Sequence, residues 1–358
     1  MRKFFIVSLS LISFGTGSVA QACDLCGCYT PQLEAIPKTS VDLTAGLPTA
    51  GALSSGRAWA AGFFGAVGEQ YTYFGTTQQD GNEVPNPTGQ YLDSSITQLV
   101  AGYTVNGRLA VQLNVPFIYR KFSRPQGFEI DNGTESGLGD ISVLAKFLAW
   151  HVERGGQPAM VQGDSKSPHL VALDPDFSFS GVLLAGMKFP SGNSDRLKEE
   201  FNEEEVPGAP ESGIHGHDLT LGTGSFDGIF GGQSSMRYKN WFFQGDLQFS
   251  LRGDGPYGYD FANDLTWDVG PGYYFVRRSD AVVGLQFVAS GEHKDLDRFG
   301  GESADDTGIT SVFVGPRVIA SFGRISAELE VDLPVLIDNT AFQTVPDYRI
   351  RGGLAIHF

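Results

Sequence analysis

Charged residues are scarce in this sequence, and basic residues are the scarcer kind. Asp, Glu, Lys and Arg make up only 18% of the 358 residues, and 41 acidic side chains outnumber 25 basic ones. The formal net charge of −16 argues against a nucleic-acid partner, because such proteins present basic patches. Intrinsic disorder is also excluded, since aromatic residues reach 12% and disordered chains contain few of them.

Long apolar runs are missing beyond the first residues. A membrane helix needs about 18 or more consecutive apolar residues, and glycine interrupts the longest candidates, at 58–67 and 181–187. A helical membrane protein is therefore excluded. The chain is instead rich in glycine, with 47 residues, and in aromatics, with 27 Phe and 12 Tyr. This composition favours an all-β protein.

The first 22 residues have the layout of a secretory signal peptide. Arg2 and Lys3 are positive, residues 4–14 are apolar, and Ala20 and Ala22 form an A-x-A pattern before Cys23. We assign 1–22 to a signal peptide, 23–56 to an N-terminal periplasmic segment, and 57–358 to one folded domain. The chain is expected to leave the bacterial cytoplasm.

The folded domain alternates apolar and polar residues with a period of two. In the last segment, Tyr348, Ile350 and Leu354 occupy one face while Arg349 and Arg351 occupy the other. Such segments are mostly ten residues or longer, the length that a tilted membrane strand requires. The sequence predicts an all-β fold, a single transmembrane antiparallel β-barrel of about twelve strands. The expected segments lie near 57–75, 92–104, 109–120, 137–150, 176–189, 218–238, 241–252, 261–275, 283–290, 312–319, 325–333 and 347–358.

Connection lengths support a barrel with short turns at one end. Short turns are expected at Asn106-Gly107, Lys239-Asn240, 278–280 and Phe322-Gly323. The alternate connections, 76–91, 121–136, 190–217, 253–259, 293–306 and 336–345, are mostly longer. Residues 151–175 form a long connection at the end where short turns are expected. Either the strands are miscounted there or the barrel has a periplasmic insertion. Both termini are expected on the short-turn, periplasmic side of a bacterial outer membrane.

Three short glycine-rich motifs carry a family resemblance. They are Gly137-Leu138-Gly139-Asp140, then residues 186–192 (Gly-Met-Lys-Phe-Pro-Ser-Gly), then Gly222-Thr223-Gly224-Ser225. Together they resemble the outer-membrane transporter family named for the meta-pathway of phenol degradation, over roughly residues 57–358. The resemblance implies a porin-like role, the passage of small molecules across the outer membrane, and brings no catalytic residues. The aromatic C-terminal Phe358 also resembles the assembly signal that the barrel-assembly machinery recognises.

All three cysteines lie in one cluster, Cys23-Asp24-Leu25-Cys26-Gly27-Cys28. Cys23 could be lipidated, although Ala20 replaces the expected Leu. Cys23, Cys26 and Cys28 could instead bind a soft metal through thiolates. A local disulfide with one spare thiol in the oxidising periplasm is the third reading. No other cofactor is expected.

An acidic loop near residue 210 contains His215-Gly216-His217 among six glutamates. Histidine and carboxylate groups can bind metal ions. Clustered like charges are more often a solvated, flexible face. We expect an exposed loop here.

The charged residues within the strands define the candidate site. Placing Arg or Lys in lipid at the bilayer midplane costs about 2–4 kcal/mol, so these side chains must face the lumen. They either form a selective constriction or fill the barrel with salt bridges. Their positions in the period-two alternation assign the following charged residues to the lumen face: Arg120, Asp140, Lys146, Lys188, Asp246, Arg252, Asp264, Asp268, Arg317, Glu328, Glu330, Asp332, Arg349 and Arg351.

Three function classes are compared. The first is an outer-membrane porin-like channel that passes small solutes by passive diffusion, with membrane lipid and the assembly machinery as further partners. The second is a barrel scaffold that anchors a partner or a metal-binding or redox complex through the Cys23–Cys28 segment. An enzyme is not expected, because none of the six histidines lies in a G-x-S-x-G or H-E-x-x-H motif.

Overall fold

The computed structural model describes residues 61–155, 160–161, 169–170, 175–201, 206–278 and 281–358. The predicted signal peptide, the N-terminal segment 23–56 and the cysteine cluster lie outside these ranges. Among the described residues, no helix is both long and apolar enough to cross a membrane.

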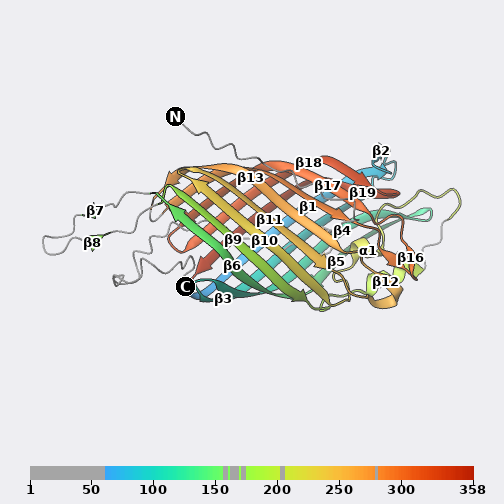
Figure 1. The fold of residues 1–358 in the computed structure, drawn as a ribbon. Coiled ribbons are helices and arrows are strands. Elements are labelled where there is room, and N and C mark those ends of the chain that lie inside the picture. Colours follow the sequence, from blue (N-terminus) through green and yellow to red (C-terminus); the bar gives the residue numbers. More distant parts are fainter. Residues whose placement is uncertain (1–60, 156–159, 162–168, 171–174, 202–205, 279–280) are drawn as a thin grey trace, which may run out of the picture.

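Twelve long antiparallel strands close into a barrel (Figure 1). Each strand pairs with its neighbours along the chain, and the last strand pairs with the first to complete the ring. The predicted all-β barrel of about twelve strands is confirmed. The twelve are β1 (Gly62–Gln79), β3 (Tyr91–Asn106), β4 (Leu109–Gln126), β6 (Ser142–Arg154), β9 (Phe177–Lys188), β10 (Asp227–Tyr238), β11 (Trp241–Leu251), β13 (Asp264–Arg277), β14 (Ala281–Lys294), β17 (Ile309–Phe322), β18 (Ile325–Asn339) and β19 (Phe342–His357).

Short elements decorate both ends of the barrel. The end with long loops, at the right of Figure 1, contains most of them. The other end has tight turns, the C-terminus and the hairpin of β7 (Met160–Val161) and β8 (His169–Leu170). The long-loop elements are β2 (Asn82–Val84), β5 (Glu129–Leu138), η4 (Asp195–Phe201), α1 (Gly216–Leu219), η5 (Pro256–Gly258), β12 (Tyr259–Asp260), β15 (Arg298–Phe299) and β16 (Glu302–Ser303).

Three of the four predicted tight turns are confirmed, with two residues separating the paired strands, while the fourth, at 278–280, includes residues outside the described ranges. Lys239 in one of them has a φ of 56°, the left-handed conformation that two-residue hairpin turns require. The long connection 155–176 adds the hairpin β7–β8 and leaves the strand count unchanged, so an insertion explains it.

Several boundaries differ from the sequence prediction. Residues 336–345 are not a long loop, because β18 continues to Asn339 and β19 begins at Phe342, which leaves a two-residue connection. Residues 121–136 are not a loop: β4 continues to Gln126, and β5 pairs with it beyond the barrel wall. The single strand expected at 137–150 is therefore the end of β5 followed by β6. Residues 218–226 precede β10 and are not strand, because this stretch packs inside the barrel mouth. Inward-facing side chains such as Phe122 make long-range contacts there, which local alternation does not encode.

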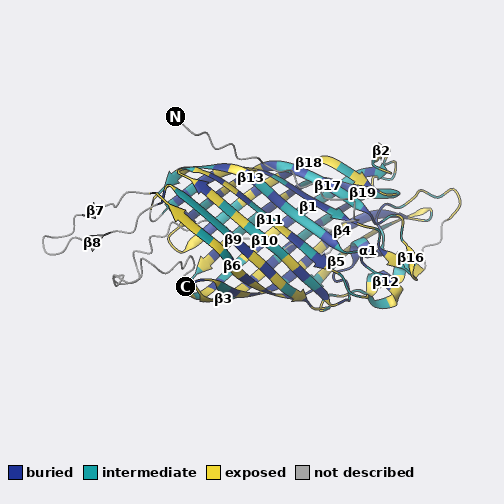
Figure 2. Cartoon of the chain, in the orientation of Figure 1, coloured by how far each residue is buried: buried dark blue, intermediate teal, exposed yellow. Residues whose placement is uncertain are grey.

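The outer wall is apolar, as a bilayer requires. Along most strands, buried residues alternate with exposed or half-buried ones, which gives the chequered pattern of Figure 2. Leu329, Leu333 and Phe287 are each more than half exposed although they lie in regular strands. Apolar surface of this extent, wrapped around a closed barrel, indicates a lipid-facing belt.

Glycines let aromatic rings pack across the inner wall. A Cβ at Gly272 would lie 2.1 Å from the ring of Phe242, and one at Gly102 would lie 2.0 Å from the ring of Phe64. Each ring therefore lies flat over a strand position that only glycine can occupy. This arrangement accounts for part of the glycine and aromatic content of the chain.

Candidate functional site: the lumen and its closed mouth

Apolar side chains fill the lumen near the short-turn end. Phe242, Tyr274 and Ile319 pack together on one side, and Phe64 and Val100 pack on another. All five side chains are buried although they point into the barrel and not into lipid. The lumen is therefore narrow at this end.

The charged residues predicted to face the lumen lie on the inward side of their strands, or just beyond the strand ends. Most are buried, while Asp246, Arg252 and Glu328 are partly buried. Arg120 and Asp332 are 0% exposed and Lys146 is 1% exposed. A wide water-filled pore would leave such side chains accessible, so side chains fill the charged part of the lumen in this structure.

A salt-bridge network lies on the inner face of one side of the barrel, from β13 to β19. Arg317 contacts Asp268 and Glu330, in each case at 2.7 Å. Arg351 contacts Glu330 at 2.7 Å and Asp332 at 2.8 Å. Charges on neighbouring strands, and on strands two apart, thus pair within the barrel, as the salt-bridge alternative in the sequence analysis expected.

Arg349 extends this network along the same side of the barrel, over the consecutive strands β14, β17, β18 and β19. Its Nε lies 3.1 Å from Asp332, its Nη2 donates to the Ser290 hydroxyl at 2.9 Å, and its guanidinium stacks 4.2 Å from the Phe313 ring centre. We call Arg317, Arg349 and Arg351 with their carboxylate partners the central network. Asp246 and Glu328 share this wall, so carboxylates outnumber guanidinium groups and the region is acidic.

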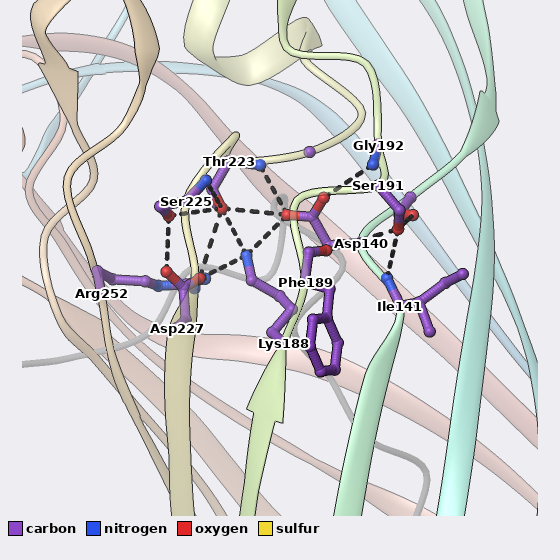
Figure 3. A network of polar contacts seen from close by, with 12 residues as sticks. Asp140, Ile141, Lys188, Phe189, Ser191, Gly192, Thr223, Ser225, Asp227 and Arg252 are labelled. Carbon is purple, nitrogen blue, oxygen red and sulfur yellow. Dashed lines mark hydrogen bonds and ion pairs between the residues drawn. The ribbon is translucent and has the colours of Figure 1, made fainter.

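A second ionic cluster lies at the long-loop end, where Asp140 binds two separate backbone segments (Figure 3). Its Oδ1 accepts the amide N–H of Gly192 at 2.9 Å, and its Oδ2 accepts that of Thr223 at 2.8 Å. Lys188 lies between two carboxylates, 2.9 Å from Asp140 and 2.6 Å from Asp227. All these carboxylate and ammonium groups are at most 3% exposed.

Further contacts extend this cluster to the next strands. Arg252 pairs with Asp227 at 2.7 Å and also with Asp264 of β13. The Ser225 hydroxyl donates to Asp227 at 2.6 Å. We call Asp140, Lys188, Thr223, Ser225, Asp227, Arg252 and Asp264 the clamp.

The clamp brings the three glycine-rich motifs together. Asp140 ends the first motif, Lys188 lies in the second, and Thr223 and Ser225 belong to the third. A Cβ at Gly222 would lie 2.4 Å from the Asp140 carboxylate, so this approach requires glycine. The motifs thus have a shared structural role, which is to hold the two stems of one long loop.

That loop, residues 189–201 and 206–226 as described, is here called the plug. It leaves β9 and returns to β10, and it reaches the opposite wall of the ring. There the Gly213 N–H donates to the Gln90 side chain at 2.8 Å, and the Thr344 N–H donates to the Gly213 carbonyl at 2.8 Å. The plug therefore spans the barrel mouth.

Apolar and arginine side chains hold the plug against the wall. Ile214 and Leu219, at most 1% exposed, pack on Phe74, Leu92 and Phe122 from three strands. Each such side chain contributes roughly 1.5–3 kcal/mol when it is fully buried.

Two arginines of β4 add polar contacts to the plug. Arg120 donates to the backbone carbonyls of Asp218 and Thr220. Arg124 contacts Glu199 at 2.7 Å and donates to the Ile214 carbonyl at 3.3 Å.

His217 is buried within the plug, contrary to the exposed loop that its acidic surroundings suggest. Its Nδ1 lies 3.1 Å from Glu200, its Nε2 lies 3.5 Å from Asp218, and its ring stacks on those of His215 and Tyr259. Burial disfavours the charged ring, but Asp218 and Glu200 outweigh burial and raise the pKa of His217 to about 10. Burial likewise opposes ionisation of Glu200, yet His217 lowers the pKa of that carboxyl to about 2.

Other predicted sites stand apart from the lumen. Phe358 is 68% exposed, and its N–H donates to the Phe63 carbonyl at 2.9 Å, next to the seam of β1 and β19. Within the described ranges, no cluster of three or more His, Cys, Asp or Glu side chains could hold a metal ion. Cys23, Cys26 and Cys28 lie outside those ranges, so their soft-metal role stays a prediction.

Comparisons with known proteins find only distant structural likenesses. No protein-family model matches the sequence, and no curated protein matches it. An outer membrane channel from Pseudomonas putida F1 is 14% identical, with a TM-score of 0.49, over 85% of this chain and 98% of the other. The β domain of the Bordetella autotransporter BrkA is 10% identical with a TM-score of 0.39, over 84% and 100% of the two chains. The CymD monoaromatic hydrocarbon channel is 7% identical with a TM-score of 0.31, over 86% and 92%.

Proposed function

We propose that this chain is a bacterial outer-membrane channel that passes small polar solutes by passive diffusion, and that the described structure is its closed state. The apolar belt supports a membrane location, and the clustering of ionisable groups in the lumen supports passage of polar solutes. A purely structural barrel interior could be apolar throughout, without the desolvation cost of buried charges. The termini would lie in the periplasm and the plug at the cell surface.

The observation that carries this proposal is how the plug is attached. Side-chain packing, ion pairs and hydrogen bonds hold it, and none of its described residues forms a strand of the ring, which is complete without it. The part of the plug between its clamped stems can therefore leave the mouth while the barrel wall stays intact. Its departure would uncover the clamp and the central network.

A scaffold is the second candidate function, because the lumen side chains are almost fully buried in this conformation. In that case the segment 23–56, with its cysteines, would bind a partner or a soft metal. Under this function the barrel would never conduct.

Planar-bilayer conductance separates the two functions. We would compare the wild type with a variant in which residues 194–219 are replaced by a short Gly-Ser linker, which leaves both clamped stems in place. The channel proposal expects rare openings in the wild type and steady conductance in the variant. Two correctly folded, heat-modifiable barrels that both stay silent would refute it and favour the scaffold.

A further inference from the structure

The plug is built around one histidine that is surrounded by carboxylates. His217 is 6% exposed and contacts Glu200 of η4 and Asp218 of α1. The backbone N–H of His217 also donates to Glu200 at 2.7 Å, so this carboxylate binds both the ring and the main chain. An uncharged ring at this position could satisfy only one of the two acids.

Charged groups from other elements surround the same place. His215, the residue before α1, contacts Asp306 at 3.3 Å. A cavity of about 30 Å³ lies between the plug and the wall, and its charged or ionisable lining residues are His217, Asp218, Asp306, Glu292 and Lys294. This volume holds about two water molecules.

The remaining neighbours do not supply the positive charge that a protonated His217 brings to the surrounding carboxylates. Tyr259 stacks on its ring and donates its own hydroxyl to Asp297, which also binds Lys294 at 2.6 Å. Arg196 and Glu199 of η4 pair with each other. Since Lys294 already binds Asp297, the acids around His217 exceed the available cations.

We infer that the plug docks with His217 protonated and leaves the barrel mouth when His217 loses that proton. A cation at His217 joins η4 to α1, and these two elements carry the Glu199 contact to Arg124 and the backbone contacts to Arg120. Loss of the charge leaves Glu200 and Asp218 facing each other across a neutral ring. These two carboxylates then repel each other within the plug.

The direction of the pH response follows from linkage. His217 has a raised pKa in the docked plug, so its contribution to docking is complete below about pH 6.5 and is lost as pH rises toward 10. Glu200 has a lowered pKa, so its contribution is present above about pH 4.5 and is lost as pH falls toward 2. Docking of the plug is therefore strongest between about pH 4.5 and pH 6.5, and alkaline conditions open the barrel mouth.

Access to Ser94 reports plug departure without requiring conduction. Ser94 is 2% exposed and lies between Leu92 and Ile96 on the inner face of β3, where both neighbours pack against the plug. We would make Ser94→Cys in full-length protein with Cys23, Cys26 and Cys28 changed to Ser. The rate of modification by a charged methanethiosulfonate is then measured from pH 5.5 to 9.5. Each rate is divided by that of the unfolded protein at the same pH, which removes the thiol's own titration.

The inference expects the normalised rate to rise about ten-fold per pH unit above 6.5, approaching about 100-fold between pH 7 and pH 9. His217→Gln should give fast labelling with no slope, whereas His151→Gln, at the opposite end of the barrel, should keep the wild-type slope. His217→Arg, which stays charged, should label slowly at every pH and serves if the Gln variant does not fold. A flat wild-type profile, or a wild-type slope in His217→Gln, would overturn the inference. A pH-dependent rate in a barrel that never conducts would refute the channel proposal alone.

Discussion

Lys188 of the clamp offers a demanding test of the lumen chemistry. Its ammonium is 3% exposed and lies between the Asp140 and Asp227 carboxylates, with the Thr223 hydroxyl 2.7 Å away. Lys188→Met keeps most of the side-chain volume and removes the charge. Breaking a buried ion pair by removing one partner typically costs about 3–5 kcal/mol.

The structure indicates the lower part of that range. Asp227 keeps its pair with Arg252, and Asp140 keeps the two backbone N–H donors of Gly192 and Thr223. We therefore expect the free energy of unfolding to fall by about 3 kcal/mol. Urea titration in lipid vesicles, followed by heat-modifiable gel mobility, measures this change.

The matched control is Lys198→Met. Lys198 lies in the plug and also pairs with an aspartate, Asp195, but its side chain is 53% exposed. Solvent screening makes such pairs weak, so the unfolding midpoint should not change measurably. If Lys188→Met unfolds at the same urea concentration as Lys198→Met, the clamp does not stabilise the barrel and the reasoning fails.

Three further outcomes are expected. Val331→Arg, on the lipid-facing side of β18, should destabilise the inserted barrel by about 2–4 kcal/mol if it lies near the midplane; an unchanged urea midpoint would mean that the faces are reversed. Deleting Phe358 should lower the yield of heat-modifiable barrel while leaving precursor synthesis unchanged, and an undiminished yield would remove its role as an assembly signal. Arg349→Ala combined with Arg351→Ala should unmask the lumen acids and strengthen a weak cation preference; the reversal potential in a salt gradient would move the other way if the acids did not set selectivity.

The barrel was predictable from the sequence because the residue pattern of a barrel strand depends only on residues close together in the chain. A residue in a barrel strand faces either the lipid or the lumen. Because successive side chains point to opposite faces, the alternation of apolar and polar residues indicates which face each residue occupies. Arg349 and Arg351 could thus be placed on the face of their strand that is opposite to Ile350, without knowledge of their ion-pair partners. Short turns such as Lys239-Asn240 have a similarly local signature.

The closed mouth could not be predicted in this way. Its contacts join residues far apart in sequence, such as Gly213 with Thr344, and the plug contains only short helical turns. A signal was nevertheless present: Leu197, Ile214 and Leu219 are apolar residues within a strongly acidic loop, and all three are buried. A flexible, solvated loop would have no need of them.

The ring closes by pairing β1 with β19, the strands most distant in sequence. Until Phe358 is in place, both strands present unpaired edges, which are templates for aggregation. Contacts of such long sequence separation form late, because the connecting chain must first be ordered. Ring closure therefore requires the first and the last strand of the barrel together, and until they pair both edges must be kept away from other chains.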